Sequence, residues 1–144
     1  MFFQILSTLS AGLFAGAAVY INLVEHPARV ECGVDSALME FAPSYRRAAV
    51  LQGALAATGF LSAIAAWFIG ASFWWLVGGS VLGSIIPFTL VVVFPTNRKL
   101  LDPALDSNSE SASMLLARWA KLHAVRSVLS LIAFLIFIGL LDRG

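Results

Sequence analysis

The chain has 144 residues, of which 60% are hydrophobic and only 12% are charged, and its mean hydropathy is +0.90. Soluble domains carry about 25% charged residues, so a chain with this composition cannot cover a water-facing surface. The net charge is +1 and the basic residues are scattered, which argues against a nucleic-acid partner. The composition therefore argues against a soluble helical domain and makes the lipid bilayer the expected solvent and partner.

Four segments are long and apolar enough to cross a bilayer as helices, which takes about 20 mostly apolar residues. They cover, approximately, residues 2–24, 48–69, 73–94 and 113–141. The first carries no charge, and the last ends in a dense apolar run over 128–141. We expect an all-α fold: one integral membrane domain over residues 1–144, built as a four-transmembrane-helix bundle with up-down-up-down topology.

Small residues at four-residue spacing occur in three of these segments and favour close packing of helices. They are Gly12 and Gly16 in the first segment, Ala49, Gly53 and Ala57 in the second, and Gly79 and Gly83 in the third. The sequence leaves open whether these faces meet within one chain or between chains, so a homo-oligomer is one expectation.

The distribution of lysine and arginine predicts the orientation in the membrane. Four crossings place both termini on one side and the connections 25–47 and 95–112 on the other. Eight of the nine basic residues lie on the side of the connections: Arg29, Arg46, Arg47, Arg98, Lys99, Arg118, Lys121 and Arg126. Only Arg143 lies opposite. The positive-inside rule then predicts cytoplasmic connections and termini outside.

A polar cluster follows the first apolar segment in the stretch "NLVEHPARV", residues 22–30. Asn22, Glu25, His26 and Arg29 are spaced i, i+3, i+4, i+7, so they share one face of a helix. Pro27 can bend this helix and thereby shift the helical phase of the residues after His26.

The start of the fourth segment carries a second cluster on one helical face, formed by Trp119, His123 and Arg126. The third segment descends to Asn97 at the same end of the bundle. All these polar groups therefore converge at one membrane depth. Polar side chains inside a bundle are costly and mark functional sites, although cations near span ends can also simply reach into the headgroups.

The chain contains two histidines, His26 and His123, and this number limits the chemistry that the polar clusters can perform. Two histidines alone are too few for a typical zinc site, which takes three or four protein ligands, although Glu25 could provide a third; we assign no metal site. Either imidazole could act as a base. If the two faced each other from different helices, they could instead be the axial ligands of a haem.

Three sequence blocks resemble the small four-helix membrane proteins of the anthrone oxygenase family, which are mostly bacterial proteins of unknown function. They are "AGLFAGAAVYINLVEHPAR" at 11–29, "PFTLVVVFPTNRKL" at 87–100 and "RWAKLHAVRSVLSLIAF" at 118–134. The pair Tyr45–Arg46 extends the resemblance. It implies a protein of the bacterial inner membrane that uses molecular oxygen to convert an anthrone-like aromatic into a quinone.

Under this resemblance we expect an oxidoreductase, a cofactor-independent monooxygenase, acting on a lipophilic aromatic small molecule. His26 or His123 would be the base, and Arg126 or Asn97 would hold the oxyanion. The substrate-binding residues would be Asn22, Glu25, Arg29, Tyr45 and Trp119, with Trp119 stacking on the rings. The alternative is a non-catalytic membrane protein: a small-molecule binder, or a haem-binding or accessory protein.

Overall fold

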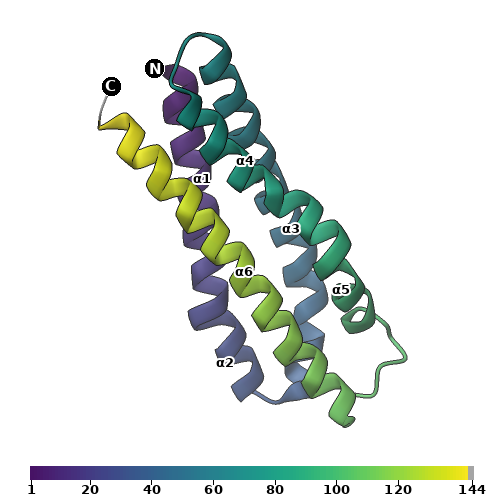
Figure 1. The fold of residues 1–144 in the computed structure, drawn as a ribbon. Coiled ribbons are helices and arrows are strands. Elements are labelled where there is room, and N and C mark those ends of the chain that lie inside the picture. Colours follow the sequence, from purple (N-terminus) through teal and green to yellow (C-terminus); the bar gives the residue numbers. More distant parts are fainter. Residues whose placement is uncertain (143–144) are drawn as a thin grey trace.

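A computed structural model describes residues 1–142 of the protein as four long helical rods (Figure 1). The first rod joins α1 (Phe2–Tyr20), a π-helical turn (Ile21–Glu25) and α2 (His26–Glu31); the second is α3 (Val34–Phe68). The third joins α4 (Phe73–Phe88), a π-helical turn (Thr89–Val93) and α5 (Phe94–Leu100), and the fourth is α6 (Glu110–Leu141). No strand occurs in the described range, so the predicted all-α fold is confirmed.

Each rod is long and apolar enough to cross a membrane, as predicted. The rods pack in a ring, in the order α1, α3, α4, α6. Figure 1 shows both ends of the chain at one end of the bundle and the α2–α3 and α5–α6 connections at the other. Large apolar side chains such as Leu13, Leu61 and Leu135 are exposed on the outside, which suits a lipid environment. Arg143, the basic residue predicted on the terminal side, lies outside the described residues.

The rods extend further than the apolar segments at the end of the bundle that carries the connections. Residues 25–47, expected to form a connection, are almost entirely helical, and only Cys32 and Gly33 separate α2 from α3. Gly33 makes the turn at φ +97°, a conformation that favours glycine. The extra turns of α3 form because Ala37 and Phe41 are buried against Leu100, Leu116 and their neighbours, a tertiary contact that hydropathy alone does not reveal.

Both π-helical turns directly precede an X-Pro pair, His26–Pro27 in the first rod and Phe94–Pro95 in the third. The residue that follows each turn donates its backbone N–H to the carbonyl oxygen five residues earlier. His26 donates to Ile21, and Phe94 donates to Thr89. Proline has no N–H to continue the ordinary ladder, so a widened turn accommodates it without breaking the rod. These turns lie at the depth where the polar clusters begin.

The core consists of two clusters stacked along the bundle. The cluster nearer the termini includes Phe14, Trp75, Leu82 and Phe137. The other, nearer the connections, includes Ile21, Phe41, Leu116 and Trp119. The polar residues of the sequence clusters lie at and below the junction of these two layers, and this is where the bundle contains a cavity.

Candidate functional site

A cavity of about 220 Å³ lies inside the bundle between the two core clusters. All four rods contribute to its wall, which is mostly apolar and includes Phe14, Phe41, Ala56 and Ile85. A few polar side chains interrupt this apolar lining: Glu25, Arg29, Ser44, Tyr45, Gln52, Thr89, Asn97, His123 and Arg126. An apolar cavity with a few convergent polar groups is the usual form of a small-molecule site.

His123 stands in the wall with one ring nitrogen fixed and the other available. Its Nδ1 lies 2.8 Å from Oδ1 of Asn22. The Asn22 amide is oriented by its Nδ2, which donates to the carbonyl of Ala120 at 3.1 Å, while Ser127 Oγ donates to Oδ1 at 2.6 Å. Because Oδ1 can only accept, Nδ1 of His123 carries the proton, and Nε2 presents a lone pair. Within the described residues Nε2 has no hydrogen-bond partner, as required of a base.

Arg126, one turn further along α6, brings a cation into the cavity. It donates from NH2 to Oε1 of Gln52 at 2.6 Å, and its guanidinium carbon lies 5.5 Å from the centre of the Phe14 ring. Its Nε is buried without a partner, and no carboxylate forms an ion pair with it in the part of the chain that the structure describes. A buried cation whose hydrogen-bond partner is a neutral amide can form an ion pair with a negatively charged group of a ligand.

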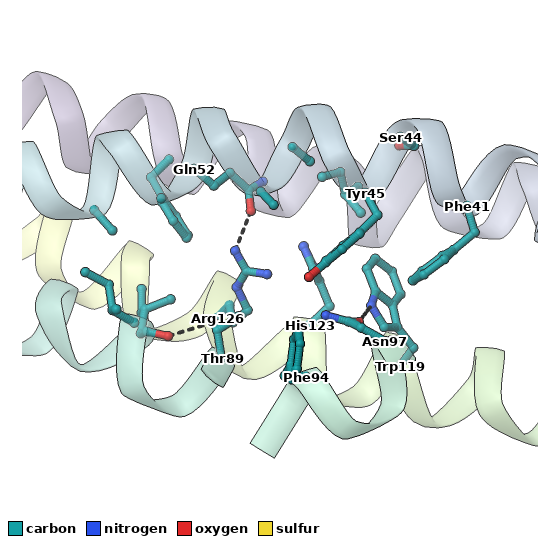
Figure 2. Close-up of a pocket in the computed structure, with 18 of the residues that line it drawn as sticks. Phe41, Ser44, Tyr45, Gln52, Thr89, Phe94, Asn97, Trp119, His123 and Arg126 are labelled. Carbon is teal, nitrogen blue, oxygen red and sulfur yellow. Dashed lines mark hydrogen bonds between the residues drawn. The ribbon is translucent and has the colours of Figure 1, made fainter. Parts of the chain in front are cut away.

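Asn97 and Trp119 form the wall of the cavity nearest the connections. The indole Nε1 of Trp119 donates to Oδ1 of Asn97 at 2.9 Å, and both residues are buried. The amide N–H2 of Asn97 makes no other hydrogen bond to the described chain and can donate to a ligand. Figure 2 shows Asn97, Trp119 and His123 on one side of the space and Tyr45 directed into it from α3. Tyr45 stacks on Phe41, with ring centroids 5.9 Å apart.

Polar residues close the cavity at its end nearest the connections. Arg29 forms an ion pair with Glu25, its Nε lies 2.6 Å from Oε2 of Glu40, and its NH2 lies 3.3 Å from Ser44 Oγ. Ser44 Oγ in turn donates to Glu25 at 2.8 Å. Every charge of this network has a partner, so Glu25 and Arg29 line the site chiefly as a structural closure.

The predicted site residues separate into two groups. Seven line the cavity: Glu25, Arg29, Tyr45, Asn97, Trp119, His123 and Arg126. Asn22 supports His123 from behind the wall. His26 does not line the cavity: its ring lies against Trp119, and it borders a shallow depression with Val30 and Leu116.

This arrangement does not fit a haem ligated by both histidines. The rings of His26 and His123 both pack on the same indole, with centroids 5.1 Å and 4.7 Å from that of Trp119. Axial imidazoles must face a shared space that holds the porphyrin, whereas here only His123 faces the cavity. The residues present therefore hold a substrate-sized molecule better than that cofactor.

Gln52 and Ser127 are site residues that the sequence interpretation missed. Gln52 is 2% exposed and accepts a hydrogen bond from Arg126. It is the one amide within the second apolar segment, 48–69, and this could have identified it, because polar groups within a span mark functional sites. Ser127 follows His123 by one turn on the same helical face. Their partners, by contrast, lie 74 and 105 residues away in sequence, which only the fold brings together.

The fold and the site define a class of protein: an integral membrane four-helix bundle with an internal, mostly apolar cavity that contains an imidazole and a guanidinium, the latter without an ion-pair partner among residues 1–142. A family model described as anthrone oxygenase matches residues 41–136 of the chain, and the chain therefore belongs to the anthrone oxygenase family. This match includes Asn97, Trp119, His123 and Arg126 but not the cluster at 22–29. No curated protein and no solved structure gives a significant match.

Proposed function

We propose that this membrane protein oxidises a lipophilic, anthrone- or quinone-like aromatic molecule in its cavity, with His123 as the base. The observation that carries the proposal is the state of His123. Its Nδ1–H is held by Asn22, and its Nε2 has no hydrogen-bond partner among residues 1–142 at the cavity wall, one helical turn from a guanidinium for which those residues provide no counter-ion. A base with a fixed tautomer beside a cation suits the formation of an enolate-like anion.

The proposed reaction uses molecular oxygen as the oxidant. His123 removes one proton from the acidic methylene of the anthrone, which leaves an aromatic anthrolate. The anthrolate transfers electrons to O₂, and a new C–O bond gives a hydroperoxide that regains the proton from the imidazolium. Loss of water from the hydroperoxide forms the new carbonyl. One oxygen atom of O₂ enters the quinone and the other leaves as water, so the balance needs no further reductant.

The remaining polar residues would stabilise the anion and orient the rings. Arg126 would pair with the oxyanion as it develops, and Asn97 would donate its amide N–H to it. The rings of Trp119, Phe41 and Tyr45 would pack against a flat aromatic ligand. Arg29 and Glu25 would keep water from the end of the cavity nearest the connections, and His26 would have no direct part in the chemistry.

The proposed setting is the bacterial inner membrane, with the connections 32–33 and 101–109 in the cytoplasm and both termini outside. Seven of the eight basic residues that the structure describes lie in the halves of their rods nearest these connections, and the eighth, Arg126, lies at the middle of α6. Arg46, Arg47, Arg98, Lys99, Arg118 and Lys121 are exposed there, as expected for residues that interact with lipid headgroups.

The test is the conversion of 1,8-dihydroxyanthrone by the purified protein in lipid nanodiscs under ¹⁸O₂. We expect oxygen uptake above that of empty nanodiscs, one ¹⁸O atom in the quinone, and loss of this excess in the His123→Gln variant. A wild-type protein that neither accelerates uptake nor binds the quinone product would overturn the proposal. Binding of the quinone without turnover would favour the alternative function, a non-catalytic binder of small molecules.

A further inference from the structure

The seam between α3 and α4 is closed over half its length and open over the other half. In the closed half, nearer the termini, a Cβ on Gly79 would lie 2.6 Å from Ala63 Cβ, and one on Gly83 would lie 2.9 Å from the Phe60 ring. Glycine at these two positions thus lets the helices touch. Because the rods form a ring, this seam lies on the outside of the bundle and faces the bilayer.

The same face of α3 continues towards the connections with Gly53 and Ala49, which lie seven and eleven residues before Phe60 in the sequence, spacings that keep residues on one helical face. Both residues line the cavity and are also exposed. A Cβ added to Gly53 would meet nothing within 4 Å. Across the seam stand Leu90, 63% exposed, and Phe94, 41% exposed, and both also line the cavity. These four residues therefore surround an opening between the cavity and the outside.

The opening lies at the depth of the hydrocarbon core. Gly53 follows the exposed Arg47 by six residues, which is about 9 Å along the helix axis, and no charge occurs between the two. Leu90 lies in the apolar part of the third span, eight residues before Arg98. The rim of the opening consists of methylene, methyl and aromatic groups. A molecule dissolved in the lipid could therefore pass through the opening without contacting a charged group.

The end of the cavity nearest the aqueous side is closed. The Glu25–Arg29–Glu40–Ser44 network joins the first π-helical turn, α2 and α3 there. Opening it would separate an arginine from two carboxylates, a costly change for partly buried charges. Access from the bilayer requires no such change.

We propose that the ligand reaches the cavity sideways from the bilayer, through the opening between α3 and the Thr89–Phe94 segment, and that Gly53 sets the size of this opening. The choice of a planar aromatic ligand rests on the proposed function, but the position of the opening does not. Gly53 is thereby a residue that controls access rather than a catalytic one, and a larger side chain at this position narrows the entrance without displacing its neighbours.

A spin label tests where the opening leads, independently of any ligand. The label is attached at Gly53→Cys in a Cys32→Ser background and, as a lipid-facing reference, at Gly16→Cys, another exposed helical glycine with open surroundings. We expect both labels to be relaxed by oxygen, which concentrates in lipid, and not by a water-soluble nickel chelate. Nickel access at Gly53 would show an aqueous opening and overturn the proposal. Dipolar broadening with access to neither reagent would show that a second copy covers the site, and this would also overturn it.

Binding kinetics test the control of access, with 1,8-dihydroxyanthraquinone as the probe in nanodiscs. We expect Gly53→Leu to slow association at least tenfold, whereas Gly16→Leu leaves it within twofold, and the rate should follow the probe's mole fraction in the lipid. Equal rates for Gly53→Leu and wild type would overturn the role of Gly53. If the wild type bound no probe, the proposed function would fail, and the spin labels alone would still decide where the opening leads.

Discussion

The string His-x-x-Arg occurs twice in the chain, at His26–Arg29 and at His123–Arg126, and its two copies have different surroundings. In the first copy the imidazole lies outside the cavity on Trp119, and the guanidinium is paired with Glu25 and Glu40. In the second the imidazole is oriented by Asn22, and the guanidinium has only the neutral Gln52 as a hydrogen-bond partner in the described chain.

The difference follows from the partners that each helix meets rather than from the strings themselves. Arg29 meets α3 where it carries Glu40 and Ser44, so its charge is neutralised. Arg126 lies closer to the middle of the bundle, where α3 offers Gln52 and α1 offers Phe14. Removing one partner of a partly buried ion pair leaves an uncompensated charge, whereas a cation without an ion-pair partner at this depth is costly and marks a candidate ligand site. The following four experiments test this contrast.

The largest expected difference is between the histidines. His123→Gln should lower anthrone turnover by about 10² to 10⁴, the range for loss of a general base. His26→Gln, the matched control, should stay within threefold of the wild type because its ring does not reach the cavity. Turnover is measured as oxygen uptake, with size-exclusion profiles to verify folding. An equal loss in both variants would contradict the assignment of His123 alone.

The next effect concerns the residue that orients His123. Asn22→Leu should lower turnover by up to about 10², because a base displaced by about 1 Å loses its alignment with the substrate. Ser127→Ala removes the other donor to Asn22 Oδ1 and leaves the imidazole bond intact, so it should cost less than threefold. Comparable losses in these two variants would mean that the network acts by holding the helices together.

Arg126→Met should weaken binding of an ionised hydroxyanthraquinone by about 10- to 100-fold, since a hydrogen bond to a charged group contributes about 1.5–3 kcal/mol. The melting temperature should stay the same or rise, because the substitution breaks no ion pair within residues 1–142. Lys121→Met, an exposed change of equal charge, should leave the affinity unaltered. Binding is measured by fluorescence titration in nanodiscs, and a fall in melting temperature without loss of affinity would refute the ligand-binding role.

Arg29→Met should have the opposite profile and the smallest effect on the ligand. We expect affinity within about threefold of the wild type, with a destabilisation of about 1–2 kcal/mol. This is less than for a fully buried ion pair, because the Glu40 side chain is 44% exposed. Thermal melts in detergent measure it, with the exposed Arg46→Met as the reference. Strong loss of affinity at unchanged stability would exchange the roles assigned to the two arginines.

The sequence by itself determined the membrane class, the four spans and the end of the bundle at which the polar groups gather. Hydropathy decides these features, because about 20 apolar residues must span the hydrocarbon and the polar residues collect at the ends of the spans. Helical spacing also placed His123 and Arg126 on one face of one helix. These properties are local, so they can be read without the fold.

Only the tertiary structure decided which histidine faces the cavity. The helical phase of the first rod shifts at the π-helical turn that precedes Pro27. A prediction that assumes regular α-helical spacing beyond Asn22 therefore puts His26 on the wrong face of the rod. The partners Gln52, Asn22 and Ser127, and the opening beside Gly53, depend on contacts between helices far apart in sequence. Whether a buried charge is neutralised depends on which side chains the neighbouring helix places at the same depth. The spacing of residues within one segment does not contain this information.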